Sequence, residues 1–171
     1  PTPNPCNKCS NTIEITSGRS VDFLEIDAAS NTQVEKIREL IETVEYKPAK
    51  GRFKIYLIDE VHMLSKASFN ALLKTLEEPP PHVVFLFATT NPEMIPKTVQ
   101  SRCLQLNLKT VNDELLIEHL RKILTSEKIK FDEDSISLIA NSANGSVRDG
   151  LTLLDQAIAF GNGKLAKEEV G

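Results

Sequence analysis

Apolar residues in the first two thirds of the chain form strand-length runs separated by stretches with helical periodicity. Mostly apolar segments at residues 21–26, 53–58 and 83–88 predict three strands, and a shorter segment at residues 104–108 predicts another. The third run is apolar throughout, which is typical of a strand buried on both faces.

Helices are predicted between these strands, where apolar residues recur every three to four positions. Ser30 and Gln33 match a capping box for the first helix, and Ser65 is placed to cap the second. Three prolines at 79–81 end the second helix. Residues 1–20 are rich in Pro, Asn, Ser and Thr, so we expect irregular structure there.

The pattern changes near residue 110. Beyond it the sequence carries no strand signal and predicts three amphipathic helices, the last capped by Ser146 with Asp149 three residues later. Strands alternating with helices, followed by helices alone, predict an α/β layer and then a small helical domain. We therefore expect an N-terminal segment at 1–20, an α/β core at 21–110 and a helical domain at 111–171.

Composition and charge narrow the classes of function. The 171 residues are 40% hydrophobic and 26% charged, as in ordinary globular proteins, and the net charge is −4. Binding to nucleic acid would therefore need a local patch. No apolar run is long enough to span a membrane. Three cysteines argue against a disulfide framework and fit a reducing cytosol. The chain begins with Pro1, which suggests a fragment or a trimmed start.

Two acids and a histidine follow the second predicted strand. A strand that delivers carboxylates at its C-terminal end can place one beside Mg²⁺ and another against a water, and Asp59 and Glu60 stand there. Two surface acids at a strand exit are the alternative. The phosphate-binding loop G-x-x-x-x-G-K-[ST] does not occur in the sequence. His62 alone is more typical of a structural histidine.

Three other polar residues are candidates for phosphate contacts, each with a plain alternative. Thr90 could hydrogen-bond a phosphate or a water, or simply end its strand. Arg102 lies in a loop, where it could be solvated or reach a neighbouring subunit's phosphates. Arg148 lies in a first helical turn, where the macrodipole disfavours a cation unless a bound anion or a nearby acid offsets it.

Cys6 and Cys9 form a C-x₂-C pair. A structural zinc site needs four ligands, and Cys103 is distant in sequence. Both a partial zinc site and two free thiols remain open. A thioredoxin-like motif is disfavoured because the pair does not lie between a strand and a helix.

Together these residues resemble the AAA+ clamp-loader ATPases of bacterial DNA polymerase III, the gamma/tau subunit family. The resemblance covers nearly the whole chain. It rests on the blocks EIDAAS at 25–30, LIDEVHMLS at 57–65, FNALLKTLEEPP at 69–80, FATT at 87–90, SRC at 101–103 and GSVRD at 145–149.

The resemblance implies a P-loop NTPase core of the AAA+ type, with a parallel sheet, followed by a small all-α lid domain. It assigns Asp59 to Mg²⁺ and Glu60 to the hydrolytic water, as a Walker B pair. Thr90 matches sensor 1. Arg102 matches the arginine that reaches the ATP site of the adjacent subunit, and Arg148 matches sensor 2.

The resemblance also implies what lies outside this sequence. The family carries its Walker A loop upstream, so we expect an N-terminally truncated fragment that alone neither binds nor hydrolyses ATP. Residues 1–20 match part of a zinc-binding module in which Cys6 and Cys9 are Zn²⁺ ligands, but Thr12 replaces a further cysteine. Residues 31–33 match a helix start that approaches DNA in the family, and here they carry no charge.

The implied function of the parent protein is DNA replication. It would use ATP to open the sliding clamp and load it onto primer–template DNA, as part of the DNA-directed DNA polymerase (transferase) holoenzyme. Its partners would be delta, delta-prime and further gamma/tau copies, in the cytoplasmic, nucleoid-associated replisome. Two alternatives remain: a non-hydrolysing delta-prime-type subunit, which typically lacks the Asp-Glu pair, and a non-catalytic interaction module.

Overall fold

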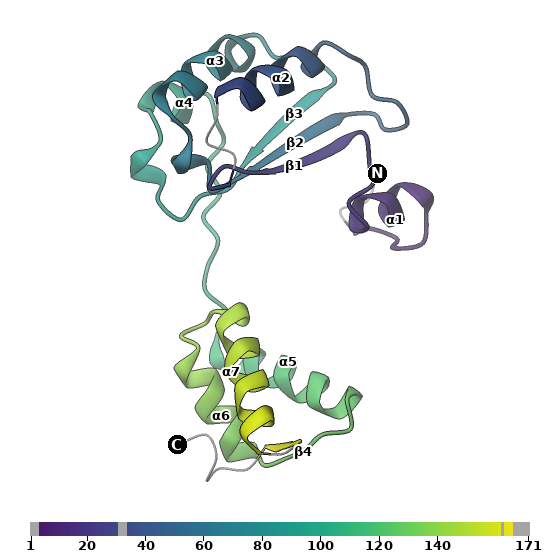
Figure 1. Cartoon of the computed structure of the whole chain (residues 1–171), viewed down its shortest axis with the longest axis vertical. Helices are drawn as coiled ribbons and strands as arrows, with labels where there is room; N and C mark the ends of the chain where they lie inside the picture. Colours follow the sequence, from purple (N-terminus) through teal and green to yellow (C-terminus); the bar gives the residue numbers. More distant parts are fainter. Residues whose placement is uncertain (1–3, 31–33, 162, 166–171) are drawn as a thin grey trace. The chain divides into compact units, whose positions relative to one another are not determined.

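The computed structural model describes residues 4–30, 34–161 and 163–165 (Figure 1). It separates the chain into two compact units, Pro1–Gln105 and Leu106–Gly171. We call them the sheet unit and the helical unit, and each is described by itself.

The sheet unit is built on three parallel strands, as the sequence predicts. They are β1 (Phe23–Asp27), β2 (Lys54–Asp59) and β3 (Val83–Phe87), in the spatial order β1-β2-β3. The connecting helices α2 (Val34–Val44) and α3 (Lys66–Glu77) both lie on one face of the sheet (Figure 1). This follows from right-handed crossovers that each lead to the next strand in the same direction.

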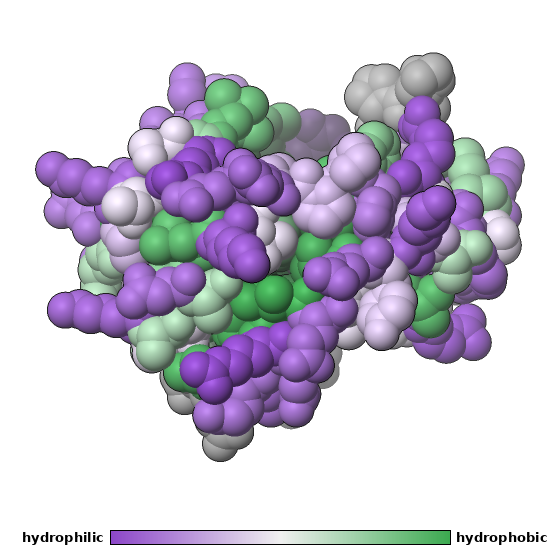
Figure 2. Space-filling model, turned by 90° about the horizontal axis from the view of Figure 1, so that it is seen from above, coloured by the Kyte–Doolittle hydropathy of each residue, from purple (hydrophilic) through white to green (hydrophobic). Residues whose placement is uncertain are grey.

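The covered face of the sheet holds the core of this unit. Tyr56 and Ile58 are completely buried beneath α2 and α3. The helices contribute the buried side chains Ile37, Leu40, Val44, Phe69 and Leu72. Seen from the top of Figure 1, the surface shows hydrophilic side chains surrounding smaller hydrophobic areas (Figure 2).

The opposite face of the sheet is largely uncovered by the described residues. Side chains alternate along a strand, so Ile55 and Leu57 face away from α2 and α3. Leu86 on β3 is 45% exposed, as is Phe53 just before β2. The prediction that the third strand is buried on both faces is therefore wrong. The strand is apolar on both faces, but the described helices cover only one of them.

Several short elements complete the sheet unit. They are α1 (Ser10–Thr16), the 3₁₀ turns η1 (Val61–Met63) and η2 (Pro92–Met94), and α4 (Lys97–Gln100). The prediction of irregular structure for residues 1–20 misses α1. This helix buries no residue, so it leaves no apolar stripe in the sequence.

The strand predicted at residues 104–108 does not form. Leu104, Leu106 and Leu108 alternate with polar residues but are 86%, 77% and 96% exposed. A strand needs a neighbour for its backbone hydrogen bonds, and no described strand lies beside this segment. The segment therefore has the alternating pattern of a strand but no neighbouring strand among the described residues to pair with.

The helical unit contains the three predicted helices, α5 (Asp113–Ser126), α6 (Glu133–Ser142) and α7 (Val147–Phe160). The predicted cap of α7 is confirmed, because the Ser146 side chain accepts the N–H of Asp149. The buried core consists of Leu116, Leu120, Leu124, Ile136, Ile139, Ala140, Ala143, Leu154, Ala157 and Leu165.

Two very short parallel strands, β4 (Lys130–Phe131) and β5 (Lys164–Leu165), correct the expectation that this region has none. Two residues are too few to show alternation in a sequence. The predicted Ser65 cap of α3 is confirmed. The capping box of Ser30 and Gln33 and the DNA-facing positions 31–33 lie outside the described residues.

None of the helices in the described ranges is long and apolar enough to cross a membrane.

Candidate active site

The carboxyl ends of the three strands bring the predicted acids and hydroxyls to one edge of the sheet, which we call the carboxyl edge. Asp27 pairs in register with Asp59, and β3 leads into Thr89 and Thr90. Two backbone hydrogen bonds join the segments that follow the strands. The N–H of Ala28 donates to Asp59 O at 2.9 Å, and that of Val61 to Ala88 O at 3.0 Å.

Glu60 has an unusual backbone conformation. Its φ of 46° and ψ of 43° lie in the left-handed region, which costs a non-glycine residue on the order of 1 kcal/mol. The chain reverses here into η1, and the Glu60 N–H donates to Asp59 Oδ1 at 2.9 Å. The two acids therefore lie together at the turn after β2.

The carboxylate of Glu60 is held by the segment after β3. Its Oε2 accepts a hydrogen bond from Thr90 Oγ1 at 3.1 Å. The same oxygen lies 3.2 Å from His62 Nδ1, which is also 2.9 Å from Thr89 Oγ1. The structure thus brings Glu60 and Thr90 into direct contact and adds His62 and Thr89 to them.

Asp59 is exposed at the same edge, beside Asp27. The pKa of Asp27 is lowered by hydrogen bonds from the Ser30 side chain and the Ala29 N–H. No group of three or more His, Cys, Asp or Glu side chains that could hold a metal occurs in the described part of the chain. One exposed carboxylate nevertheless fits Mg²⁺, which usually keeps several waters and binds through one or two carboxylates plus phosphate oxygens.

Arg102 is engaged elsewhere in the sheet unit. Its guanidinium donates to Glu77 Oε1 at 2.6 Å, at the end of α3, and also to the carbonyl of Thr98. The side chain is 33% exposed. The structure does not bring Arg102 to Glu60 or Thr90 through any contact between described residues.

Arg148 belongs to the helical unit, in the first turn of α7. It is exposed, and its guanidinium forms no ion pair with any residue in the described ranges. No acid in the described ranges therefore compensates, through a direct ion pair, the unfavourable interaction of this cation with the helix macrodipole.

Cys6, Cys9 and Thr12 form a small cluster at the start of α1. Cys9 Sγ lies 3.0 Å from Thr12 Oγ1, and the N–H of Cys9 donates to Cys6 Sγ at 3.4 Å. Backbone hydrogen bonds from Lys8 and Cys9 lower the pKa of the Cys6 thiol to about 7. Two thiols and a hydroxyl do not fit the four-ligand set of a structural zinc, so the described residues do not form a zinc site.

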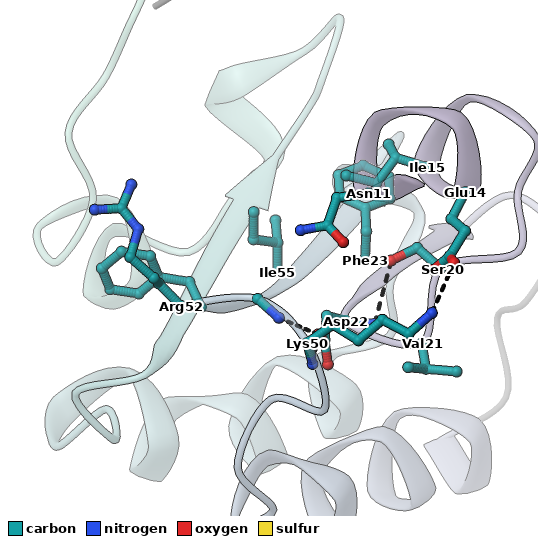
Figure 3. Close-up of a pocket in the computed structure, with 12 residues that line it drawn as sticks. Asn11, Glu14, Ile15, Ser20, Val21, Asp22, Phe23, Lys50, Arg52 and Ile55 are labelled. Carbon is teal, nitrogen blue, oxygen red and sulfur yellow. Dashed lines mark hydrogen bonds and ion pairs between the residues drawn. The ribbon is translucent and has the colours of Figure 1, made fainter. Parts of the chain in front are cut away.

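A cavity of about 200 Å³ lies near the amino ends of β1 and β2, opposite the carboxyl edge, between α1 and the loop before β2 (Figure 3). Three of its charged side chains or their backbones take part in hydrogen bonds or ion pairs. Asp22 accepts the N–H groups of Ala49, Lys50 and Gly51, each at 2.7 Å, and Lys50 Nζ lies 2.7 Å from Glu14 Oε1. The two acids that line the cavity, Asp22 and Glu14, are therefore both paired, whereas Arg52, which also lines it, forms no ion pair with any described residue.

Sequence reasoning missed the link between His62 and Thr89. A lone histidine after two acids carries no signal of its own. The available signal was the alignment of two polar strand ends, because parallel strands in register bring the residues that follow them together.

Comparison with protein-family models covers most of the chain. Residues 1–112 match the model described as DNA polymerase III, delta subunit. Residues 116–163 match the DNA polymerase III clamp loader subunit, ATPase lid domain.

Curated relatives are similar over almost the whole chain. DNA polymerase III subunit tau of Escherichia coli (strain K12) is 55% identical over 169 residues, 99% of this chain and 26% of that protein. DNA polymerase III subunit gamma of Buchnera aphidicola subsp. Baizongia pistaciae is 51% identical over 98% of this chain and 45% of its own length. The chain thus spans between about a quarter and a half of these relatives.

Solved structures show the same fold at low identity. The Thermotoga maritima RuvB Holliday junction branch migration motor has a TM-score of 0.72 and 16% identity, covering 93% of this chain and 53% of that one. A gamma subunit-related protein of Thermotoga maritima has a TM-score of 0.52 and 20% identity, covering 92% and 58%. The fold is that of P-loop, AAA+ proteins.

A parallel sheet with acids at its carboxyl edge, two matching family models and more than 50% identity to tau and gamma subunits lead to one conclusion: the chain belongs to the family of DNA polymerase III clamp-loader subunits.

Proposed function

We propose that this chain is the AAA+ part of a clamp-loader motor subunit of the gamma/tau type. The parent protein uses ATP to open the sliding clamp and to load it onto primer–template DNA. The observation that carries the proposal is the hydrogen bond between Glu60 Oε2 and Thr90 Oγ1 at the carboxyl edge of a parallel sheet. It joins the acid that would orient a water to the hydroxyl that would sense phosphate.

Each residue at this edge has a role that its position supports. Asp59 is exposed and would hold Mg²⁺, which would neutralise charge on the phosphates. Glu60, held by its neighbours, polarises the attacking water. Thr90 follows β3, and its hydrogen bond to Glu60 couples the position of this segment to that of the Glu60 carboxylate.

The two arginines act at interfaces. Arg102 reaches the ATP of the adjacent subunit, for which it must exchange the Glu77 carboxylate for a phosphate. Arg148 is exposed, without an ion pair to any described residue, and it senses phosphate from the lid. An anion near the start of α7 would also relieve the unfavourable position of this cation.

The wider assignments follow the family. Residues 21–110 form the AAA+ core, residues 111–171 form the lid, and residues 1–20 are what remains of the zinc-binding module. Partners are delta, delta-prime and further gamma/tau copies, the sliding clamp and primed DNA, in the bacterial cytoplasm.

The test is ATP hydrolysis by the full-length subunit in its assembled loader. Glu60→Gln keeps the size of the side chain but removes its charge, so it lowers kcat by about 10²–10⁴-fold. Glu42→Gln on α2 makes the same chemical change at an exposed position away from the carboxyl edge, and it leaves kcat unchanged. Equal kcat in the two variants would overturn the proposal.

Purified residues 1–171 alone are expected to show no ATP turnover, because the sequence contains no phosphate-binding loop. Turnover by these residues that Glu60→Gln abolishes would contradict this expectation.

A second candidate is a non-hydrolysing structural subunit of the same loader. It is favoured by the description of the model that residues 1–112 match, which is a delta subunit. In that case Arg102→Ala would lower the ATPase rate of the assembly, whereas Glu60→Gln would not, because only the neighbouring subunit would hydrolyse ATP.

A further inference from the structure

His62 lies between the two segments that meet at the carboxyl edge. Its side chain is 13% exposed, compared with 35% for Glu60. Nδ1 is 2.9 Å from Thr89 Oγ1 and 3.2 Å from Glu60 Oε2. The ring therefore bridges the turn after β2 to the end of β3.

The geometry assigns the proton on this ring. Glu60 Oε2 is a hydrogen-bond acceptor, so its approach to Nδ1 at an ion-pair distance of 3.2 Å favours the tautomer that carries the proton on Nδ1. The Nδ1–H thus faces Glu60 Oε2 and Thr89 Oγ1. The hydroxyl of Thr90 donates to the same carboxylate oxygen at 3.1 Å.

Both groups lie at one oxygen of Glu60: Thr90 Oγ1 donates a hydrogen bond to Oε2, and His62 Nδ1 lies 3.2 Å from the same atom. Its other oxygen, Oε1, accepts no hydrogen bond from any residue that the structure describes. The terminal torsion of a glutamate is broad, so an unanchored carboxylate samples many orientations. The Thr90 hydrogen bond and the adjacent His62 ring together restrict Oε2 to one orientation and leave Oε1 available.

We propose that His62 is a positioning residue: together with Thr90 it fixes Glu60 Oε2, so that Glu60 Oε1 is the atom presented to the attacking water. The inference rests on the proposed ATPase function and deepens it. His62 acts through Glu60 and does not itself touch the reacting atoms.

The test compares three substitutions of His62 in the full-length subunit within its assembled loader. His62→Leu removes the donor and lowers kcat about 10- to 100-fold, with KM for ATP unchanged, because orientation and not binding is lost. His62→Asn keeps an N–H on the atom bonded to Cγ, as in Nδ1 of histidine, and stays within about threefold of the wild-type kcat. His62→Gln moves its amide one bond further and behaves like His62→Leu.

His82 provides a matched control. It is also half-buried and makes a side-chain contact, from Nε2 to Val44 O at 3.2 Å, but it lies before β3, at the opposite end of the sheet. His82→Leu leaves kcat at the wild-type value. Thermal melting of each variant in residues 1–171 measures folding separately from activity, and the Asn and Gln variants decide the question if His62→Leu does not fold.

The outcomes separate the two proposals. If Glu60→Gln abolishes hydrolysis while His62→Leu retains the wild-type kcat, the inference is overturned and the proposed function stands. Equal losses in His62→Asn and His62→Gln also overturn it, because the ring would then act through packing alone. Hydrolysis that is insensitive to Glu60→Gln overturns the proposed function itself.

Discussion

The helical unit and the sheet unit bury their apolar residues to different extents. In the helical unit, Leu116, Leu120, Leu124 and Ile136 are completely buried by helices that are neighbours in sequence. In the sheet unit, α2 and α3 cover one face of the sheet, and Leu86 on the other face remains 45% exposed. Short-range contacts therefore complete one core, whereas the sheet presents apolar surface on its second side.

The difference shows how each architecture uses sequence. Three amphipathic helices can close a core with their own inward stripes. A parallel sheet needs cover on both faces, since its strands are apolar on both. Predictions that compare matched residues in the two units can test this contrast.

The largest expected effect is in the closed core. Leu120→Ala removes a completely buried side chain from α5 and should lower the free energy of unfolding of the helical unit by about 2–5 kcal/mol. Leu86→Ala on the open face of β3 should lower that of the sheet unit by less than about 1 kcal/mol. Hydrogen exchange measured by mass spectrometry on residues 1–171 reports each unit separately. Equal losses would show that the second face is covered in solution.

A smaller effect is expected at a glycine turn between α6 and α7. Gly145 has a φ of +77°, and a Cβ there would lie 2.7 Å from Val111 O and Thr110 Cβ. Gly145→Ala should destabilise the helical unit by roughly 1–3 kcal/mol through backbone strain and this clash.

Gly18 in the sheet unit is the matched control. Its φ is +67°, but a Cβ would meet nothing within 4 Å. Gly18→Ala should therefore show only the conformational cost of about 1 kcal/mol. Urea unfolding followed by exchange protection in each unit measures both changes, and a larger loss for Gly18→Ala would contradict the steric argument.

The smallest expected effect depends on pH. Burial raises the pKa of Asp22. Hydrogen bonds from the N–H groups of Gly51, Ala49 and Lys50, together with the charge of Lys54, lower it by more, so the pKa lies below its ordinary value of 3.8. The folded carboxyl thus holds its proton less tightly than the unfolded one. Its stabilisation of the loop before β2 is complete above the ordinary value and is lost as pH falls through the lower folded pKa.

Amide exchange of Ala49, Lys50 and Gly51 should therefore accelerate in strong acid relative to the amides of the helical unit. Asp22→Asn should remove this pH dependence. A loop whose protection is the same at pH 2 and pH 5 would exclude this role for Asp22.

The sequence predicts the elements that follow from local pattern. Three strands, both crossover helices and the caps at Ser65 and Ser146 are confirmed, because apolar periodicity and capping are properties of a few adjacent residues. The strand at 104–108, the full burial of β3 and the absence of α1 are wrong. Each depends on a partner or on cover that periodicity does not encode.

The candidate site is predictable in the same measure. Asp59 and Glu60 stand out because they end an apolar strand, and Thr90 because it ends the next one. The contact between Glu60 and Thr90 depends on the register of the strands, which is known only from the structure. The ion pair between Arg102 and Glu77 could not be predicted from the sequence, because the two residues are 25 positions apart.

The left-handed backbone of Glu60 has an evolutionary consequence. Asparagine or glycine would occupy that conformation at lower cost, so stability alone would favour replacing the glutamate. A glutamate at this position therefore comes with a less stable turn than asparagine or glycine would give. A search for thermostable variants of this chain would then be drawn to position 60, and the variants it recovered there would fold better while losing the carboxylate on which the proposed reaction depends.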